Sequence, residues 1–144
     1  MAKTVLAIGA HYDDCVFGLP GILLKAARSG YKVTVLSVIG DYSNWTPVGE
    51  ARQNVLIEGA RRLGRERGVE MRFLDYKSMD IPFDDGSKRA VCEVVAEVQP
   101  DLGFMLWPRD THPDHEAVSA LSKVAFNWSA AVLNKSGIRR PSSY

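Results

Sequence analysis

Two short segments of the chain combine histidine and aspartate side chains that could carry out acid–base or metal chemistry. The first, AHYDDC at residues 10–15, contributes His11, Asp13 and Asp14 and directly follows the apolar run TVLAIG. Two adjacent carboxylates near a buried strand end repel each other, which costs free energy unless a cation or a solvent-filled cleft relieves the repulsion. The spacing therefore indicates a binding site at this point of the chain.

The second segment, PRDTHPDH, carries Asp110, His112, Asp114 and His115. The chain has three histidines in all, and each of them lies in one of these two segments. Imidazole and carboxylate groups suit zinc, and two histidines with one carboxylate and an open position form a catalytic zinc arrangement. We expect such a site, in which a second carboxylate beside the ion accepts a proton from water.

Strands and helices alternate along the chain and must position these segments. Continuous apolar runs predict strands at 4–10, 32–40, 71–76 and 102–107. Amphipathic spacing with glycine or proline stops predicts helices at 21–30, 51–67, 88–99 and 116–133. The alternation specifies a Rossmann-like three-layer α/β/α fold with a mostly parallel sheet of strand order 3-2-1-4. Ligands bind such sheets at the switch point, here between the first and fourth strands, and both segments follow those strands.

Length, composition and charge restrict the class of protein. The 144 residues, 46% hydrophobic and 24% charged, fit a single domain over residues 1–144. A net charge of +1 gives no reason to expect nucleic acid or an anionic membrane as a partner. Cys15 and Cys92 imply no disulfide framework, and no apolar run is long enough to span a membrane. We therefore expect a cytoplasmic protein.

The two segments resemble the signature of the zinc-dependent de-N-acetylases of the PIG-L/LmbE type. That signature has an A-H-P-D-D-E stretch after the first strand and an H-P-D-H stretch after a later strand, which stand here as AHYDDC and HPDH. The stretches FGLPG, VTVLSVIGD and PDLGFMLWPRDTHPDH extend the resemblance over roughly the whole chain. The resemblance implies a zinc-dependent hydrolase that removes the acetyl group from an N-acetylated amino sugar of the N-acetylglucosamine type.

The resemblance also implies individual roles within the two segments. The zinc ligands that it implies are His11, Asp14 and His115. By the same resemblance Asp13 is the general base and His112 assists with the tetrahedral intermediate. Asp114 resembles the outer partner that orients a histidine.

The chain departs from the family pattern near the first segment. Tyr12 stands where the family has proline, Cys15 where it has glutamate, and Pro20 replaces a glycine. A thiolate binds zinc well, so Cys15 is either a further ligand or a small residue packed at a helix start. The packing role is favoured because three ligands are already present.

Candidate substrate contacts come from three other parts of the chain. Arg52 matches an arginine of the family, although a solvated helix residue explains it equally well. Tyr42 and Trp45 follow the second strand, where we expect them at the rim of the cleft; aromatic faces suit sugar rings, but loop aromatics also cover neighbouring helices. Asp80 is the remaining polar candidate near the rim, and Ser78 stays open beside it.

Three other functions fit parts of the sequence. A dinucleotide-binding domain would need a glycine-rich turn, whereas two carboxylates follow the first strand and would repel phosphate. A magnesium-dependent phosphatase would leave the histidines unexplained, because magnesium prefers oxygen ligands. The stronger alternative is a non-catalytic zinc-binding relative or a subunit of a larger assembly, because the first segment has drifted from the family pattern.

The end of the chain leads to a further expectation. Members of the resembling family generally run well past the second segment, whereas this chain stops at RRPSSY. We expect a domain that is short at its C-terminus and a sheet that ends at the fourth strand, whose free edge invites a partner. A homo-oligomer is then one expectation, together with a monomer that binds zinc but is a weak enzyme.

Overall fold

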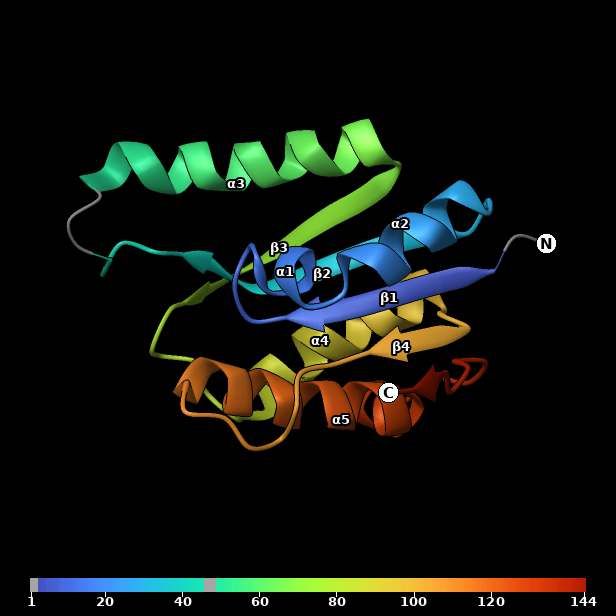
Figure 1. Ribbon diagram of the computed structural model, residues 1–144. Helices are drawn as coiled ribbons and strands as arrows, with labels where there is room; N and C mark the ends of the chain where they lie inside the picture. Colours follow the sequence, from blue (N-terminus) through green and yellow to red (C-terminus); the bar gives the residue numbers. More distant parts are fainter. Residues whose placement is uncertain (1–2, 46–48) are drawn as a thin grey trace.

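In the computed structural model the chain forms a parallel sheet with helices on both faces (Figure 1). The structure describes residues 3–45 and 49–144, with side chains at 3–45 and 55–144. The strands are β1 (Thr4–Gly9), β2 (Lys32–Asp41), β3 (Val69–Lys77), β4 (Leu102–Phe104) and β5 (Ser142–Ser143). The helices are α1 (Asp14–Gly18), α2 (Pro20–Arg28), α3 (Gly49–Arg67), α4 (Asp85–Val98) and α5 (Pro113–Leu133). None of the described helices combines the length and apolar character that a membrane span requires.

The sheet has the strand order β3-β2-β1-β4-β5, and every neighbouring pair is parallel. The predicted order 3-2-1-4 is confirmed, but the expectation that the sheet ends at the fourth strand was wrong. Ser142 pairs with Leu102 and Ser143 with Gly103, so β5 covers this edge. The fourth strand is also shorter than predicted, because its pairing with β1 ends at Phe104.

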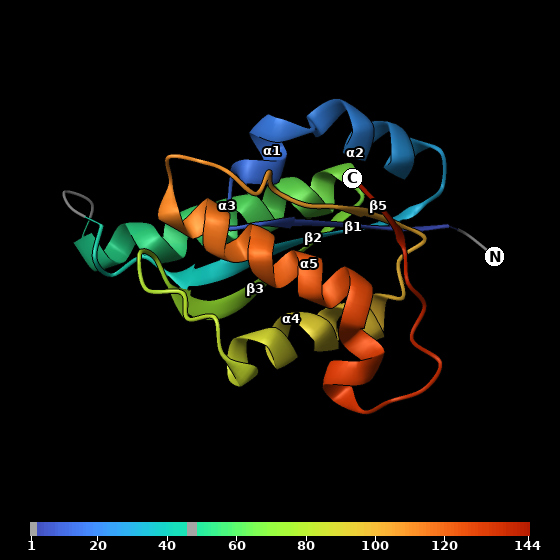
Figure 2. The same cartoon turned by 90° about the horizontal axis from the view of Figure 1, so that it is seen from below.

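The helices form two layers, with α1, α2 and α3 on one face of the sheet and α4 and α5 on the other (Figures 1 and 2). In β1, Val5 and Ala7 belong to the core on the α2 side. Leu6 and Ile8 belong to the core on the α5 side, where Phe126 packs against them. Burial on both faces explains why this strand is a continuous apolar run rather than an alternating one.

The two C-terminal helices begin earlier in the chain than predicted. Helix α4 begins at Asp85 because the Asp84 carboxylate accepts a hydrogen bond from the Ser87 backbone N–H at 2.9 Å in a capping box. Helix α5 begins at Pro113, a residue well suited to a first helical position. Its N-cap is His112, whose Nδ1 accepts from the Asp114 backbone N–H at 3.2 Å. Asp114 therefore lies in the first turn of α5 rather than in a loop.

A charged contact holds the start of β1. It lies at the end of this strand opposite the two segments that carry the histidines. The Asp101 Oδ2 accepts from the Thr4 backbone N–H at 2.8 Å and from its hydroxyl at 3.1 Å. The Arg139 guanidinium donates to the other Asp101 oxygen at 3.0 Å. The backbone hydrogen bond from Thr4 lowers the pKa of Asp101 below its ordinary value, and desolvation opposes this effect only in part.

Replacement of Asp101 by asparagine should reduce stability in a pH-dependent manner. A depressed carboxyl pKa contributes stability that is present above the unfolded-state value of about 3.9 and is lost as pH falls through the folded-state value. Thermal unfolding should therefore show Asp101→Asn less stable than the wild type near neutral pH and equally stable in strong acid. Asp75→Asn, which changes an exposed carboxylate of β3, is the matched control. A stability difference for Asp101→Asn that stays constant down to strong acid would contradict this role.

Candidate metal centre

The three histidines meet where β1 and β4 end. The His11 ring centroid lies 4.7 Å from that of His112 and 5.3 Å from that of His115. The rings of His112 and His115 stack at 4.8 Å. This is the switch point at which the two segments are predicted to meet.

Asp14 sits directly under the end of β1, at the first position of α1. Its Oδ2 accepts hydrogen bonds from the backbone N–H groups of Ala10 and His11, both at 2.8 Å. A Cβ at Gly9 would lie 2.9 Å from the Asp14 Cβ, so the strand has to end in glycine for this turn to close. Burial raises the pKa of Asp14, but hydrogen bonds from the His11 ring and backbone outweigh burial and bring the pKa below its ordinary value.

His11 is buried between two carboxylates. Its Nε2 lies 3.0 Å from the Asp114 Oδ2, and its Nδ1 lies 3.6 Å from the Asp14 Oδ2. Burial lowers the pKa of His11, but its contacts with Asp14 and Asp114 more than compensate, and the pKa is raised above the ordinary value. An ionised carboxylate can only accept hydrogen bonds, so the Nε2 of His11 carries a hydrogen toward Asp114. In the neutral ring this leaves the Nδ1 as the atom with the free lone pair.

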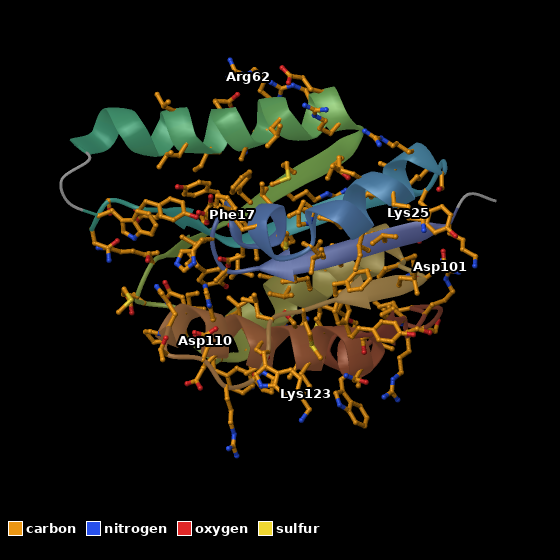
Figure 3. The ribbon with its side chains drawn as sticks, viewed as in Figure 1. Phe17, Lys25, Arg62, Asp101, Asp110 and Lys123 are labelled. Carbon is orange, nitrogen blue, oxygen red and sulfur yellow. The ribbon has the colours of Figure 1, made fainter. Side chains whose placement is uncertain are left out.

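His115 has a carboxylate of its own. Its Nδ1 lies 3.0 Å from the Asp110 Oδ2, and its Nε2 lies 3.3 Å from the Asp14 Oδ1. The Asp110 Oδ1 accepts from the His112 backbone N–H at 2.9 Å, and this bond, reinforced by the His115 ring, lowers the pKa of Asp110. Figure 3 labels Asp110 in the loop that leads into α5. The sequence predicts no individual role for Asp110, although an aspartate two residues before His112 is typical of a local turn.

Two groups of side chains in the described part of the chain could hold a metal ion, each with ligand atoms within 4.8 Å of one another. One group consists of His11, Asp14 and His115, and the other of His11, His112 and Asp114. Both contain the buried ring of His11, which makes this residue the centre of the cluster.

Asp13 and Cys15, the neighbours of Asp14, differ sharply in their surroundings. Asp13 is the N-cap residue of α1, but its carboxylate makes no capping hydrogen bond and is partly exposed. Cys15 is buried among the apolar residues on the α2 side of the sheet. Burial, with a smaller effect of the Asp14 charge, raises the pKa of the Cys15 thiol to about 12. Its sulfur joins neither group of metal-binding side chains found among the described residues, which favours the packing role.

Of the two aromatic residues after β2, Tyr42 does not lie where it was expected. Tyr42 is 3% exposed and therefore lies beneath the surface rather than at the rim of a cleft. Its hydroxyl accepts a hydrogen bond from the Tyr12 backbone N–H at 2.9 Å, and burial raises its pKa. Trp45 stays partly exposed, packs against Tyr42 at 4.9 Å between ring centroids, and lies 5.8 Å from the His11 ring.

The other candidate substrate residues are spread over different surroundings. Ser78 is 1% exposed and donates to the Asp114 Oδ2 at 2.9 Å, so it belongs to the interior of the site. Asp80 is exposed, and no hydrogen bond or ion pair joins its side chain to the histidine cluster within the described residues. Arg52 lies in α3, but its side chain is outside the described residues.

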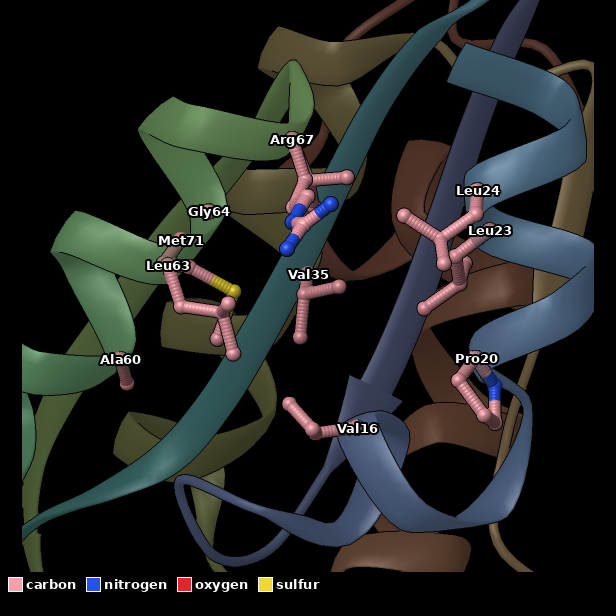
Figure 4. A pocket seen from close by; sticks show the side chains of 11 residues that line it. Val16, Pro20, Leu23, Leu24, Val35, Ala60, Leu63, Gly64, Arg67 and Met71 are labelled. Atoms are coloured by element: carbon pink, nitrogen blue, oxygen red, sulfur yellow. The ribbon is translucent and has the colours of Figure 1, made fainter. Parts of the chain in front are cut away.

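A separate apolar cavity of about 330 Å³ lies between α2 and α3, over the sheet. Figure 4 shows Leu23, Val35 and Met71 among its lining residues, with Arg67 as the only charged side chain among them. None of the histidines or acidic residues of the two segments lines it. Among the described residues, the cavity therefore offers no acidic, histidine or cysteine side chain for acid–base or metal chemistry.

Comparison with known proteins identifies the family. The PIG-L family model, described as GlcNAc-PI de-N-acetylase, matches residues 6–126. A diacetylchitobiose deacetylase of Thermococcus kodakarensis is 32% identical over 143 residues, which cover 88% of this chain and 53% of that protein. The chain therefore belongs to the PIG-L family. It spans about half the length of this curated relative.

Solved structures with the same fold include enzymes of different kinds. The N,N′-diacetylchitobiose deacetylase of Pyrococcus horikoshii, in complex with an inhibitor, has a TM-score of 0.82 and 24% identity, covering 99% of this chain and 58% of that one. The 4-carboxy-2-hydroxymuconate hydratase GalB of Pseudomonas putida KT2440 has a TM-score of 0.79 and 20% identity, covering 97% of this chain and 62% of that one. A deacetylase and a hydratase share this fold, so the fold alone does not decide the reaction.

Loss of the Tyr42 hydroxyl should destabilise the turn that holds the first segment. Tyr42→Phe keeps the ring but leaves the Tyr12 N–H without its partner, which should lower the free energy of unfolding by about 1 kcal/mol. Urea unfolding measures this difference. Tyr76→Phe is the control, because within the described residues the Tyr76 hydroxyl makes no hydrogen bond. Equal stability of the two variants would show that the Tyr42 hydroxyl does not hold the turn.

Proposed function

We propose that the chain binds one zinc ion through His11, Asp14 and His115 and uses it to remove the acetyl group from an N-acetylated amino sugar. The observation that carries the proposal is the convergence of the His11 Nδ1, the His115 Nε2 and the Asp14 carboxylate. In each histidine the other ring nitrogen is bonded to a carboxylate. The His11 Nδ1 and the His115 Nε2 both face Asp14, at 3.6 and 3.3 Å from its oxygens. Facing lone pairs repel unless a proton or a cation lies between them.

The second group of side chains fits a metal less well. Asp114 already accepts hydrogen bonds from the Ser78 hydroxyl, the Met79 N–H and the His11 ring. The His112 Nδ1 is likewise occupied, as the cap that accepts from the Asp114 N–H. A cation on this group would have to break these bonds in the interior, where an unsatisfied polar group costs about 1–3 kcal/mol. The group that contains Asp14 requires no such loss.

The chemistry of the donor atoms supports zinc over magnesium. Two imidazole nitrogens and one carboxylate oxygen form a common catalytic zinc set, whereas magnesium prefers oxygen ligands. Each histidine also holds its second nitrogen against a carboxylate, Asp114 for His11 and Asp110 for His115. Such outer carboxylates fix the tautomer and orientation of zinc-binding histidines.

The residues around the proposed centre have separate roles in amide hydrolysis. A bound zinc ion would polarise the acetamide carbonyl and lower the pKa of a coordinated water toward neutrality. Asp13, uncommitted to capping α1, accepts a proton from the attacking water and passes it to the departing amine. The His112 Nδ1 already accepts a hydrogen bond, so its Nε2 carries the hydrogen that can be donated to the developing oxyanion. Acetate and a free amino sugar result.

The choice of an acetamido sugar rests on the named relatives. The family model is described as a GlcNAc-PI de-N-acetylase, and the Thermococcus relative is named a diacetylchitobiose deacetylase. Both names describe removal of an acetyl group from an N-acetylated glucosamine unit. The alternative, a non-catalytic zinc-binding relative, is favoured by the departures of the first segment from the family pattern, where Tyr12 and Cys15 stand in place of proline and glutamate. The alternative predicts zinc binding without release of acetate.

Removal of one proposed ligand should remove the metal. His115→Ala should lose stoichiometric zinc after dialysis against a mild chelator, because two remaining ligands hold the ion weakly. His112→Ala, which changes the ring stacked on His115, is the matched control and should keep its zinc. Elemental analysis of both purified variants gives the answer. Full zinc content in His115→Ala, or loss of zinc in His112→Ala alone, would refute the ligand assignment.

Replacement of the proposed base should separate catalysis from metal binding. Asp13→Asn should retain zinc and slow acetate release from N,N′-diacetylchitobiose by about 10²–10⁴-fold, the usual cost of losing a general base. Acetate release and zinc content are measured on the same preparation. If zinc is lost in parallel with activity, Asp13 is a ligand rather than the base.

A further inference from the structure

A series of hydrogen bonds runs from the loop after β2 to the ring of His11. The Trp45 Nε1 donates to the Ser78 Oγ at 3.0 Å, and the Ser78 Oγ donates to the Asp114 Oδ2 at 2.9 Å. The same Asp114 oxygen lies 3.0 Å from the His11 Nε2. Ser78, Asp114 and His11 are 1%, 2% and 6% exposed, so water does not compete for these bonds.

The donor groups fix the direction of each hydrogen bond in this series. An indole N–H can only donate, so the Ser78 hydroxyl must accept from Trp45. A hydroxyl has a single hydrogen, which Ser78 therefore gives to Asp114. Asp114 in turn has only acceptor oxygens, so the His11 Nε2 must carry a hydrogen. The order of donors thus determines which nitrogen of His11 keeps its lone pair.

The backbone around Ser78 holds this series of hydrogen bonds in place. The Ser78 N–H donates to the Asp41 carbonyl at 2.9 Å, and the Ser78 carbonyl accepts from the Asn44 side chain at 2.8 Å. The next residue, Met79, has a φ of 65°, a left-handed conformation that residues with a Cβ rarely adopt. In this conformation the Met79 N–H donates to both oxygens of Asp114, at 2.8 and 3.1 Å. Backbone strain of this kind persists where the surroundings hold it in place.

We propose that Ser78, oriented by the indole N–H of Trp45, is a positioning residue that fixes the tautomer of His11 through Asp114. The role differs from the substrate contact considered for Ser78 and Trp45 from the sequence. Its consequence for metal binding rests on the proposed function, because only a ring with hydrogen on Nε2 presents its Nδ1 lone pair beside Asp14. The tautomer itself is a property of the metal-free protein.

Two variants interrupt this series of hydrogen bonds at different points. Ser78→Ala removes the hydroxyl, so the Asp114 Oδ2 loses one donor and the Trp45 N–H loses its acceptor. Trp45→Phe keeps an aromatic ring but removes the N–H together with the five-membered ring of the indole, which frees the Ser78 hydroxyl to turn away from Asp114. Trp45 is partly exposed, so this second variant tests the proposal even if Ser78→Ala folds poorly. Ser122→Ala is the matched control, because the Ser122 hydroxyl is buried but donates within α5, to the Val118 carbonyl.

The test uses metal-free protein with ¹⁵N-labelled histidine, at a pH where His11 is neutral, and the ring nitrogen shifts report the tautomer. The wild type and Ser122→Ala should show hydrogen on the His11 Nε2. Both Ser78→Ala and Trp45→Phe should show an increased population with hydrogen on Nδ1. The zinc dissociation constant, measured by competition with a chelator, should rise by about 10–100-fold in Ser78→Ala and by less in Trp45→Phe.

The outcomes separate this inference from the proposed function. If Ser78→Ala and Trp45→Phe both keep the wild-type tautomer and the zinc affinity of Ser122→Ala, Ser78 is not a positioning residue. If the tautomer shifts in the variants while the wild type binds no zinc, the positioning role stands and the proposed metal centre fails. A tautomer shift together with weakened zinc binding supports both.

Discussion

The site depends on the different contacts of the two oxygens of Asp14. The Oδ2 accepts the backbone N–H groups of Ala10 and His11, and so closes the tight turn that follows β1. The Oδ1 is left to face the ring of His115, which comes from the far end of the chain. One carboxylate thus builds the turn and supplies the acceptor on which the two segments converge. Without Gly9 at the strand end this position would not be accessible to Asp14.

The parallel sheet brings the second half of the site to this carboxylate. Because β1 and β4 are neighbours and run in the same direction, the loops at their carboxyl ends lie side by side. His115 then reaches Asp14 from the first turn of α5, and Asp110 holds its other nitrogen. Asp114 and Asp110 each bond to one histidine, so the two rings leave their unshared nitrogens on the Asp14 side. The fold thus fixes where the rings lie, and the outer carboxylates fix which nitrogen is free.

Much of this arrangement could be predicted from the sequence, for physical reasons. The β1 residues are apolar on both faces because helices cover both sides of the sheet, and this pattern locates the strand and its parallel neighbours. The histidines of the two segments, which follow β1 and β4, could be assigned to a common edge from topology alone. The candidate metal-binding group that contains Asp14 is one of the two that the structure brings together.

Other features depend on contacts that leave no pattern in the sequence. Strand β5 is two serines long and forms only because β4 offers an unpaired edge. Helix α5 starts at Pro113 with a histidine as its cap, which is not among the preferred capping residues. Ser78 forms hydrogen bonds with residues that are distant in sequence, and Asp110 forms its bonds within a local turn. Neither hydrophobic periodicity nor a motif points to these bonds. Tyr42 was expected at the rim of a cleft, but the fold buries it.

The most direct test of the account is the position of zinc in a crystal of the metal-loaded protein. Diffraction data collected on both sides of the zinc absorption edge locate the ion independently of any model of the side chains. The account predicts one anomalous peak bounded by the His11 Nδ1, the Asp14 Oδ1 and the His115 Nε2, with zinc–nitrogen distances of about 2.0–2.1 Å. A peak among His11, His112 and Asp114, or no peak at this end of the sheet, would contradict it.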